Sequence, residues 1–201
     1  MTAPLRGKRA PANEVRIIGG QWKRSKLPVP DAPGLRPTPD RVRETLFNWL
    51  GQDLTGWRCL DAFAGSGALG FEAASRGAAE VLLVERDARL ARSLRESQQR
   101  LAAAAVRVEV ADALAFMRRA HTGSYELVFI DPPFDAGLSE PALQAAVPLV
   151  VPGGFVYLES DRAFDAAAIA PLRLHRHGRA GNVHFHLLQR DDAPARPVTP
   201  G

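Results

Sequence analysis

Three glycines and one acidic residue near the middle of the chain have the types and spacing of a nucleoside-binding loop. Gly65, Gly67 and Gly70 form a G-x-G-x-x-G pattern, and Glu85 follows Gly65 by 20 residues. Glycines at these positions permit a tight turn and a close approach of the backbone to a ligand. An acid at the end of the next strand can accept hydrogen bonds from ribose hydroxyls. The pattern predicts a ligand that contains a nucleoside, and a tight turn without any ligand is the alternative.

The residue four positions before Gly65 helps to distinguish a dinucleotide from S-adenosylmethionine. Asp61 would lie close to the pyrophosphate of a dinucleotide, where like charges repel in a partly desolvated crevice. The same carboxylate would attract the ammonium and sulfonium groups of S-adenosylmethionine. Asp112, which precedes Ala113, can accept a hydrogen bond from an adenine amine, and a helix N-cap explains it equally well. Asp61 therefore favours S-adenosylmethionine.

A second motif follows a very apolar run and predicts the reaction. The tetrapeptide Asp-Pro-Pro-Phe at 131–134 comes directly after residues 127–130. Its prolines have no amide donors, so the Asp131 side chain and the Pro132 carbonyl are left as acceptors. Together they can accept both hydrogens of a nucleobase amino group, whose lone pair then points at a methyl donor. Phe134 can stack on the base. The motif predicts methylation of that amino group, with an ordinary strand-ending turn as the alternative.

Alternating β-rich and helical segments from Trp57 onward must position these motifs. Such alternation is typical of a parallel sheet with helices on both faces, in which ligands bind at the carboxyl edge. Strands are expected at 58–62, 80–85, 106–110, 125–130 and 155–159, and helices at 68–76, 88–102, 113–119 and 140–147. The connection at 178–182 is too short for a helix, so segments 172–177 and 183–189 are expected to form an antiparallel hairpin.

The first 50 residues have a different organisation. A short hairpin is expected between Val15 and Val29, with its turn at Gly19-Gly20. The proline-rich stretch that follows is expected to be an extended strap. Thr38 then caps a helix whose first residue is Pro39. We expect this helix to pack through Val42, Leu46, Trp49 and Leu50, and to expose Arg41, Arg43 and Glu44.

Composition and charge exclude several classes of protein. The 201 residues suit one globular domain, and the 46% hydrophobic content allows a core. The most apolar stretch, 145–158, contains two prolines and is too short to span a bilayer. Cys59 is the one cysteine and is expected in the core of a cytoplasmic protein. Residues 1–43 hold ten Lys and Arg against three acids, a net of +7, whereas the rest carries −3. A basic arm before an acidic body predicts contact with a polyanion, unless the arm is only a solubilising terminus.

The two motifs together resemble those of the amino-methyltransferases. Asp61-Ala-Phe-Ala-Gly-Ser-Gly67 is similar to their cofactor loop, and the segment 131–134 is similar to their catalytic motif. Arg16-Ile-Ile-Gly-Gly20, Leu27-Pro-Val-Pro30, Gly34-Leu-Arg-Pro-Thr38 and the segment 40–50 resemble the bacterial 16S rRNA guanine-N2 methyltransferases of the guanine-966 type. The resemblance covers about 15–188. It implies an α/β fold with the Rossmann-like seven-stranded methyltransferase sheet, mostly parallel with a C-terminal antiparallel hairpin, beside the small N-terminal β-hairpin.

The resemblance also implies roles for individual residues. Asp61, Gly65 and Gly67 would line the methionine part of S-adenosylmethionine, Glu85 would hold the ribose, and Asp112 with Ala113 would meet the adenine. The guanine would be bound by Asp131, Pro132 and Phe134. Further cofactor-binding positions are Phe63, Arg86 and Thr38. The positions assigned to RNA are Arg16, Lys23, Arg24, Lys26, Arg36, Arg41 and Arg43. The segment 182–187 departs from the more aromatic strand of the family, so substrate contacts from it are not carried over.

The resemblance further implies a cytoplasmic enzyme that acts on 16S rRNA in the 30S subunit or a late assembly intermediate. We expect a monomer without metal or membrane contact. Its parts would be a disordered basic tail (1–14), a hairpin and strap (15–37), a methyltransferase domain (38–190) and a disordered tail (191–201). The alternatives are an adenine-N6 methyltransferase of DNA or RNA, an NAD-binding oxidoreductase and a non-catalytic ribosome assembly factor. His175, His177, His184 and His186 could form a metal site, but nearby arginines favour a solvent-facing or RNA-facing surface.

Overall fold

The structure of the protein is a computed structural model, which describes residues 13–31, 37–133, 136–163 and 169–191. Arg36, Phe134 and nearly all of both expected tails lie outside these residues. The strands are β1 (Asn13–Arg16), β2 (Lys26–Val29), β3 (Arg58–Asp61), β4 (Glu80–Glu85), β5 (Val106–Val110), β6 (Tyr125–Ile130), β7 (Val150–Ser160), β8 (Leu172–Ala180) and β9 (Val183–Arg190). The helices are α1 (Asp40–Trp49), α2 (Ala68–Ser75), α3 (Ala88–Arg100), α4 (Ala113–Arg119) and α5 (Ser139–Ala146), followed by a 3-10 turn, η2 (Val147–Leu149).

Seven strands form one sheet in the order β5-β4-β3-β6-β7-β9-β8. The first five of these run parallel, and β9 is antiparallel to both β7 and β8. This confirms the mostly parallel sheet with a C-terminal antiparallel hairpin. The expected strand at 155–159 is longer in the structure, since β7 begins at Val150. The hairpin turn is also tighter than expected, because β8 continues to Ala180 before Val183 opens β9.

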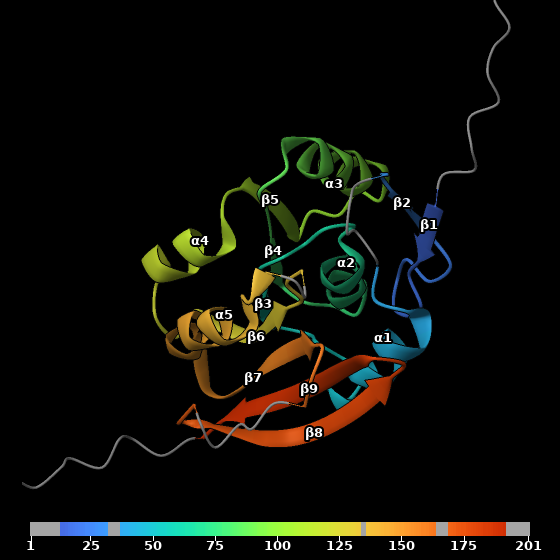
Figure 1. Ribbon diagram of the computed structural model, residues 1–201. Helices are drawn as coiled ribbons and strands as arrows, with labels where there is room; N and C mark the ends of the chain where they lie inside the picture. The colour runs from blue at the N-terminus through green and yellow to red at the C-terminus, as the bar shows by residue number, and fades with distance from the viewer. Residues whose placement is uncertain (1–12, 32–36, 134–135, 164–168, 192–201) are drawn as a thin grey trace, which may run out of the picture.

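Helices cover the two faces of the sheet, with α4 and α5 on one side and α1, α2 and α3 on the other (Figure 1). The two faces correspond to two apolar clusters. One contains Phe47 of α1, Phe71 of α2 and Phe129 of β6, and the other contains Phe116 of α4 and Leu143 of α5. Cys59 is fully buried in the first cluster, which confirms its expected place in the core. In the described part of the chain, none of the helices combines the length and apolar character needed to cross a membrane.

The N-terminal hairpin is present, but its turn is wider than expected. β1 pairs antiparallel with β2, and the loop between them runs over the C-terminal end of α2 rather than closing at Gly19-Gly20. Gly20 has a φ of +72°, and a Cβ there would lie 1.8 Å from the backbone oxygen of Ser75. The two glycines therefore permit a close approach to α2. The boundary between residues 15–37 and 38–190 stays a prediction, since Val15 and Leu27 belong to the same apolar cluster as α2.

Two expectations about α1 are wrong. Pro39 occupies the N-cap position without a side-chain hydrogen bond, and the hydroxyl of the buried Thr38 points to Asp131 instead. Arg43 is fully buried rather than exposed, and it pairs with Glu72 of α2 and Asp40. It also donates to the backbone oxygens of Arg16 and Thr38. Because Arg43 is enclosed between α2 and the N-terminal hairpin, it cannot contact RNA in this structure, and its assigned role is corrected to a structural one.

Candidate functional site

Four acidic residues stand at the carboxyl ends of parallel strands. Asp61 ends β3, Glu85 ends β4, Asp131 follows β6 directly, and Glu159 is the last residue but one of β7. In open α/β sheets this edge is where ligands bind. Helices α2 and α4 also begin here. The sequence motifs thus come from separate parts of the chain to one side of the sheet.

The glycine loop between β3 and α2 is held by Glu85. One carboxyl oxygen of Glu85 accepts a hydrogen bond from the Gly65 amide at 2.9 Å, and the other accepts from the Asp87 amide at 2.8 Å. Gly67 is the N-cap residue of α2 with a φ of +78°, and a Cβ there would lie 2.7 Å from Leu94 and Phe71. The loop therefore requires glycine for its shape and packing. Through these two hydrogen bonds Glu85 connects the glycine loop after β3 to the end of β4. Its side chain is still partly exposed to solvent beside the loop.

Asp61 is almost completely enclosed by this loop, with a relative exposure of 1%. Its Oδ2 accepts a hydrogen bond from the Gly70 amide at 3.0 Å, which joins the end of β3 to the first turn of α2. Burial raises the pKa of Asp61 to about 7, and the nearby charge of Glu85 acts in the same direction. Asp61 thus positions the glycine loop and adds negative potential to the edge.

Asp131, which is half-buried, belongs to a network of polar groups whose other members are buried. The Thr38 hydroxyl donates to Asp131 Oδ2 at 3.4 Å, and its presence also lowers the pKa of Glu159. The Tyr157 hydroxyl donates to Glu159 Oε1 at 2.8 Å. Glu159 is only 3% exposed. Sequence reasoning missed this residue, although it is the last residue of the strand expected at 155–159 and an acid at a strand end is the signal that had singled out Asp61 and Glu85.

The electrostatics of this network favour a cationic or hydrogen-donating ligand. Burial raises the pKa of Asp131, and the charges of Glu159 and Asp61 raise it further, while the Thr38 hydrogen bond opposes them. Burial likewise raises the pKa of Glu159. Within the described residues, none of these three carboxyl groups forms an ion pair with Lys or Arg. A bound cation or N–H donor would favour the ionised forms of these acids.

The other residues expected to bind the cofactor are arranged around the same edge. Asp112 is the N-cap of α4 and accepts from the Ala115 amide at 2.9 Å, so the helix-cap explanation is correct. Asp112 is exposed, and its carboxylate can accept further hydrogen bonds. Phe63 is partly exposed, Arg86 is exposed, and Ala113 and Pro132 are buried. Phe134 lies outside the described residues. Their contacts with a cofactor stay predictions.

The residues assigned to RNA divide into three groups. Arg16 and Lys26 are at least partly exposed, but they are paired with Asp40 and Glu14 respectively. Lys23, Arg24 and Arg41 are exposed, and no ion pair is found for them among the described residues. Arg43 is buried, as described above, and Arg36 lies outside the described residues. Lys23 and Arg24, in the loop of the N-terminal hairpin, are thus the most available cations of that hairpin.

The four histidines do not form one group. The rings of His177, His184 and His186 stack on one another, whereas His175 packs edge-on against Phe155. Burial lowers the pKa of His186 to about 4, so this ring is neutral near pH 7. The expected solvent-facing surface is therefore correct for the exposed His177 but not for His186, which is 1% exposed.

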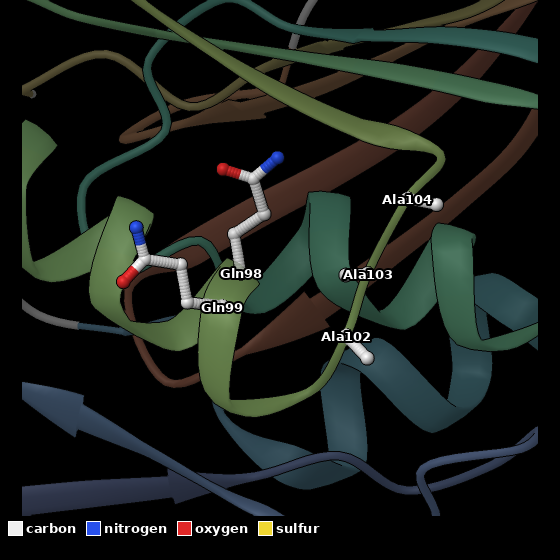
Figure 2. Close-up of a pocket in the computed structure, with 5 residues that line it drawn as sticks. All are labelled: Gln98, Gln99, Ala102, Ala103 and Ala104. Carbon is white, nitrogen blue, oxygen red and sulfur yellow. The ribbon is translucent and has the colours of Figure 1, made fainter.

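A separate hollow of about 430 Å³ lies away from the acidic edge. Its lining comes from the C-terminal end of α3 and the turn before β5, where Figure 2 shows two glutamine side chains and three alanines. This is the amino edge of the sheet, opposite the ends of β3 and β6. The lining holds no titratable or nucleophilic group, so the carboxyl edge remains the candidate site.

Comparison with known proteins identifies close relatives. Residues 15–189 match the family model described as "Conserved hypothetical protein 95". The chain is 44% identical over 187 residues to ribosomal RNA small subunit methyltransferase D of Escherichia coli, which covers 90% of this chain and 92% of that protein. It is 40% identical over 183 residues to the protein of the same name from Haemophilus influenzae, over 88% of this chain and 94% of the relative.

Solved structures have the same fold. The Escherichia coli protein yhhF, provisionally assigned as a methyltransferase, superposes with a TM-score of 0.79 at 40% sequence identity. The superposition covers 90% of this chain and all of that one. A protein from Thermus thermophilus described as hypothetical superposes with a TM-score of 0.70 at 32% identity, over 86% of this chain and 98% of the other. The seven-stranded sheet is therefore a methyltransferase fold.

Proposed function

Because the chain belongs to the Conserved hypothetical protein 95 family and is 44% identical to ribosomal RNA small subunit methyltransferase D of Escherichia coli, we propose that it methylates guanine N2 in 16S rRNA. The methyl donor would be S-adenosylmethionine. The substrate would be one guanine of the 966 type, in the 30S subunit or a late assembly intermediate. The enzyme would act as a cytoplasmic monomer without a metal in the reaction.

The residues at the carboxyl edge fit the proposed cofactor. S-adenosylmethionine, when bound, supplies a methyl group on a positively charged sulfur. The cluster of Asp61, Asp131 and Glu159 has raised pKa values and no partner cation among the described residues, which suits a ligand that carries positive charge. Glu85 is available for ribose hydroxyls beside the glycine loop. A dinucleotide would instead bring its pyrophosphate towards this negative cluster, which disfavours the NAD-binding alternative.

Asp131 is the residue to which we assign the central chemical role. Its carboxylate and the Pro132 carbonyl would accept the hydrogens of guanine N2 and hold the nitrogen for in-line attack. When N2 gains a methyl group it must lose one proton, and a carboxylate of raised pKa is a suitable acceptor for it. Guanine presents N1–H beside N2–H, so one carboxylate can accept from both, whereas adenine presents a lone pair at N1.

Glu159 and Thr38 would position Asp131 rather than touch the base. The Thr38 hydroxyl orients the Asp131 carboxyl group, and the charge of Glu159 raises the pKa of Asp131. Tyr157 in turn holds Glu159. This network carries the proposal, because it orients the Asp131 carboxyl group and raises its pKa, as an acceptor for the amino group of guanine requires.

Lys23, Arg24 and Arg41 would contact the phosphate backbone of the RNA. The target guanine must leave its stack to reach Asp131, which costs least for an unpaired base. The basic hairpin would then supply binding energy without reading sequence.

Two measurements test the proposed function. Calorimetric titration with S-adenosylmethionine and with NAD should give saturable binding of the first and none of the second. Transfer of a tritiated methyl group should then be compared on unmethylated 30S subunits, naked 16S rRNA and DNA, and 30S subunits should be the best substrate. Binding of NAD would contradict the assignment of the cofactor, and equal labelling of DNA would contradict that of the substrate.

Affinity for S-adenosylmethionine should increase as pH rises from 5.5 to 7.5. Asp61 has a pKa of about 7, so it holds a proton at the acidic end of the range, and the pKa values of Asp131 and Glu159 are shifted in the same direction. A cationic ligand binds the ionised forms better, so binding should release protons and strengthen by up to about tenfold per pH unit for each proton released. Titration calorimetry in two buffers of different ionisation enthalpy measures both the affinity and the number of protons released. Affinity that is flat across this range, with no proton release, would refute the electrostatic account of the site.

Reversal of charge at Lys23 and Arg24 should weaken RNA binding alone. We expect K23E/R24E to lower kcat/KM for 30S subunits by about 10- to 100-fold near physiological salt, because two phosphate contacts are lost and repulsion is added. Affinity for S-adenosylmethionine should not change. The matched control is R107E/R118E, which makes the same charge change at exposed positions of β5 and α4. An equal loss of kcat/KM in both variants would mean that the N-terminal hairpin has no special role in RNA binding.

A further inference from the structure

Three imidazole rings of the C-terminal hairpin gather on one face of the sheet. His177 of β8 lies opposite His186 of β9 in the strand pairing, and His184 is two residues before His186 on the same side of its strand. Their nitrogen ligand atoms all lie within 4.8 Å of one another. His177 Nε2 and His184 Nδ1 are only 3.0 Å apart.

These distances are close to what one metal ion requires. Zinc binds imidazole nitrogen at about 2.0–2.1 Å in tetrahedral sites, so two nitrogens on the same ion are roughly 3.3 Å apart. The closest pair, at nearly this separation, is hydrogen-bonded, so a metal ion would displace the shared proton. The three rings, whose planes lie within 19° of one another, would rotate to direct their nitrogens at the ion. All three backbone positions belong to paired strands, which fixes them relative to one another.

The surroundings of the cluster also suit a metal ion. His186 Nδ1 lies 3.4 Å from the backbone oxygen of Leu158, a contact that would orient Nε2 as the ligand atom. Arg179 is opposite His184, but its Nε donates to the Gly181 oxygen at 2.8 Å in the hairpin turn. Arg173 pairs with Asp191, and Arg176 donates to the His175 oxygen. Of these arginines, Arg173 is neutralised by an ion pair, whereas Arg176 and Arg179 are held by backbone oxygens and keep their charge beside the cluster.

We propose that His177, His184 and His186 bind one divalent late transition-metal ion, with Zn²⁺ as the favoured ion. Three neutral imidazoles suit this class of metal, and the exposed side of the cluster leaves a fourth position for water. The ion would cross-link β8 to β9 at the edge of the sheet. It would take no part in methyl transfer, so this inference is independent of the proposed function.

The test uses the full chain without any histidine tag, after treatment with a chelator. Titration with Zn²⁺ by calorimetry should give one ion per chain, and Co²⁺ should produce the visible absorption of a four-coordinate site. H184Q and H177Q should each weaken Zn²⁺ binding by about 100-fold or more. Loss of a group that only hydrogen-bonds to a metal ligand already costs about 10- to 100-fold in affinity, and loss of the ligand itself should cost more. H175Q is the matched control, because His175 is on β8 but faces Phe155, and it should bind within about threefold of the unmodified chain.

Thermal unfolding gives a second readout. Zn²⁺ at about 100 times its Kd should raise Tm by roughly 5–10 °C in the unmodified chain and in H175Q, but not in H184Q. The proposal is overturned if Zn²⁺ binding does not saturate at one ion per chain. It is equally overturned if H184Q binds as tightly as the unmodified chain, which would mean that His177 and His184 only share a proton.

Discussion

Replacing Asp131 with asparagine should lower the rate of methyl transfer by about a thousandfold while affinity for S-adenosylmethionine changes by less than about tenfold. The amide keeps the size of the side chain but loses the charge and the ability to take a proton from N2. A general base and a preorganised acceptor are each worth about 10²- to 10³-fold in rate. Single-turnover transfer to 30S subunits, measured beside calorimetric binding of the cofactor, separates the two effects.

The matched variant for this experiment is Glu159→Gln. The amide oxygen of the introduced glutamine can still accept from Tyr157, so that contact should remain while one charge beside Asp131 is removed. We expect a smaller loss of rate than in D131N and a pH–rate profile displaced to lower pH, because the charge of Glu159 helps to raise the pKa of Asp131. If D131N lost cofactor affinity and turnover equally, the division of roles between the glycine loop and Asp131 would be wrong.

Replacing Glu72 with glutamine should lower the free energy of unfolding by about 3–5 kcal/mol, the usual effect of breaking a buried ion pair. Glu72 of α2 is fully buried and pairs with two guanidinium groups, those of Arg43 and Arg76. It also accepts from the amides of Ile18 and Gly19 at 2.7 and 2.8 Å. Removal of its charge leaves two buried cations with weaker partners. Urea unfolding measures the change, and Tm should fall by roughly 10 °C.

The control is Glu44→Gln, on the exposed side of α1, which should change stability by less than about 0.5 kcal/mol. Glu72 joins the loop of the N-terminal hairpin to α2, so E72Q should also increase proteolysis within residues 17–25. Stability of E72Q within about 1 kcal/mol of the unmodified chain would mean that the hairpin is held by its apolar contacts alone.

Much of the sheet could be predicted because its signals are local. The bounds of β4, β5, β6 and α4 match the expected ranges, since each is an apolar or amphipathic run between turn residues or caps. The antiparallel hairpin followed from a connection too short for a helix. The ends of β7 and β8 were less predictable, because glycine and charged residues continue these strands where sequence patterns would end them.

The errors occurred where distant parts of the chain meet. Helical periodicity placed Arg43 on the exposed face, but Glu72 of α2 and the backbone of β1 lie against that face. Thr38 has the residue type of an N-cap, yet its hydroxyl points to Asp131, 93 positions away. The network around Asp131 therefore could not be predicted from the sequence, because it depends on how α1 packs against β6 and β7. Sequence reasoning did find Asp61, Glu85 and Asp131, because each of them belongs to a motif and also stands at the end of an expected strand.

The most direct test of the account is the identity of the methylated nucleoside. Unmethylated 30S subunits would be incubated with the full chain and tritiated S-adenosylmethionine, and their RNA digested to nucleosides and separated. The proposed function predicts label in N2-methylguanosine, at one methyl group per subunit, with an initial rate about a thousandfold lower for D131N. Label in N6-methyladenosine, or no label with an enzyme that binds the cofactor, would contradict it.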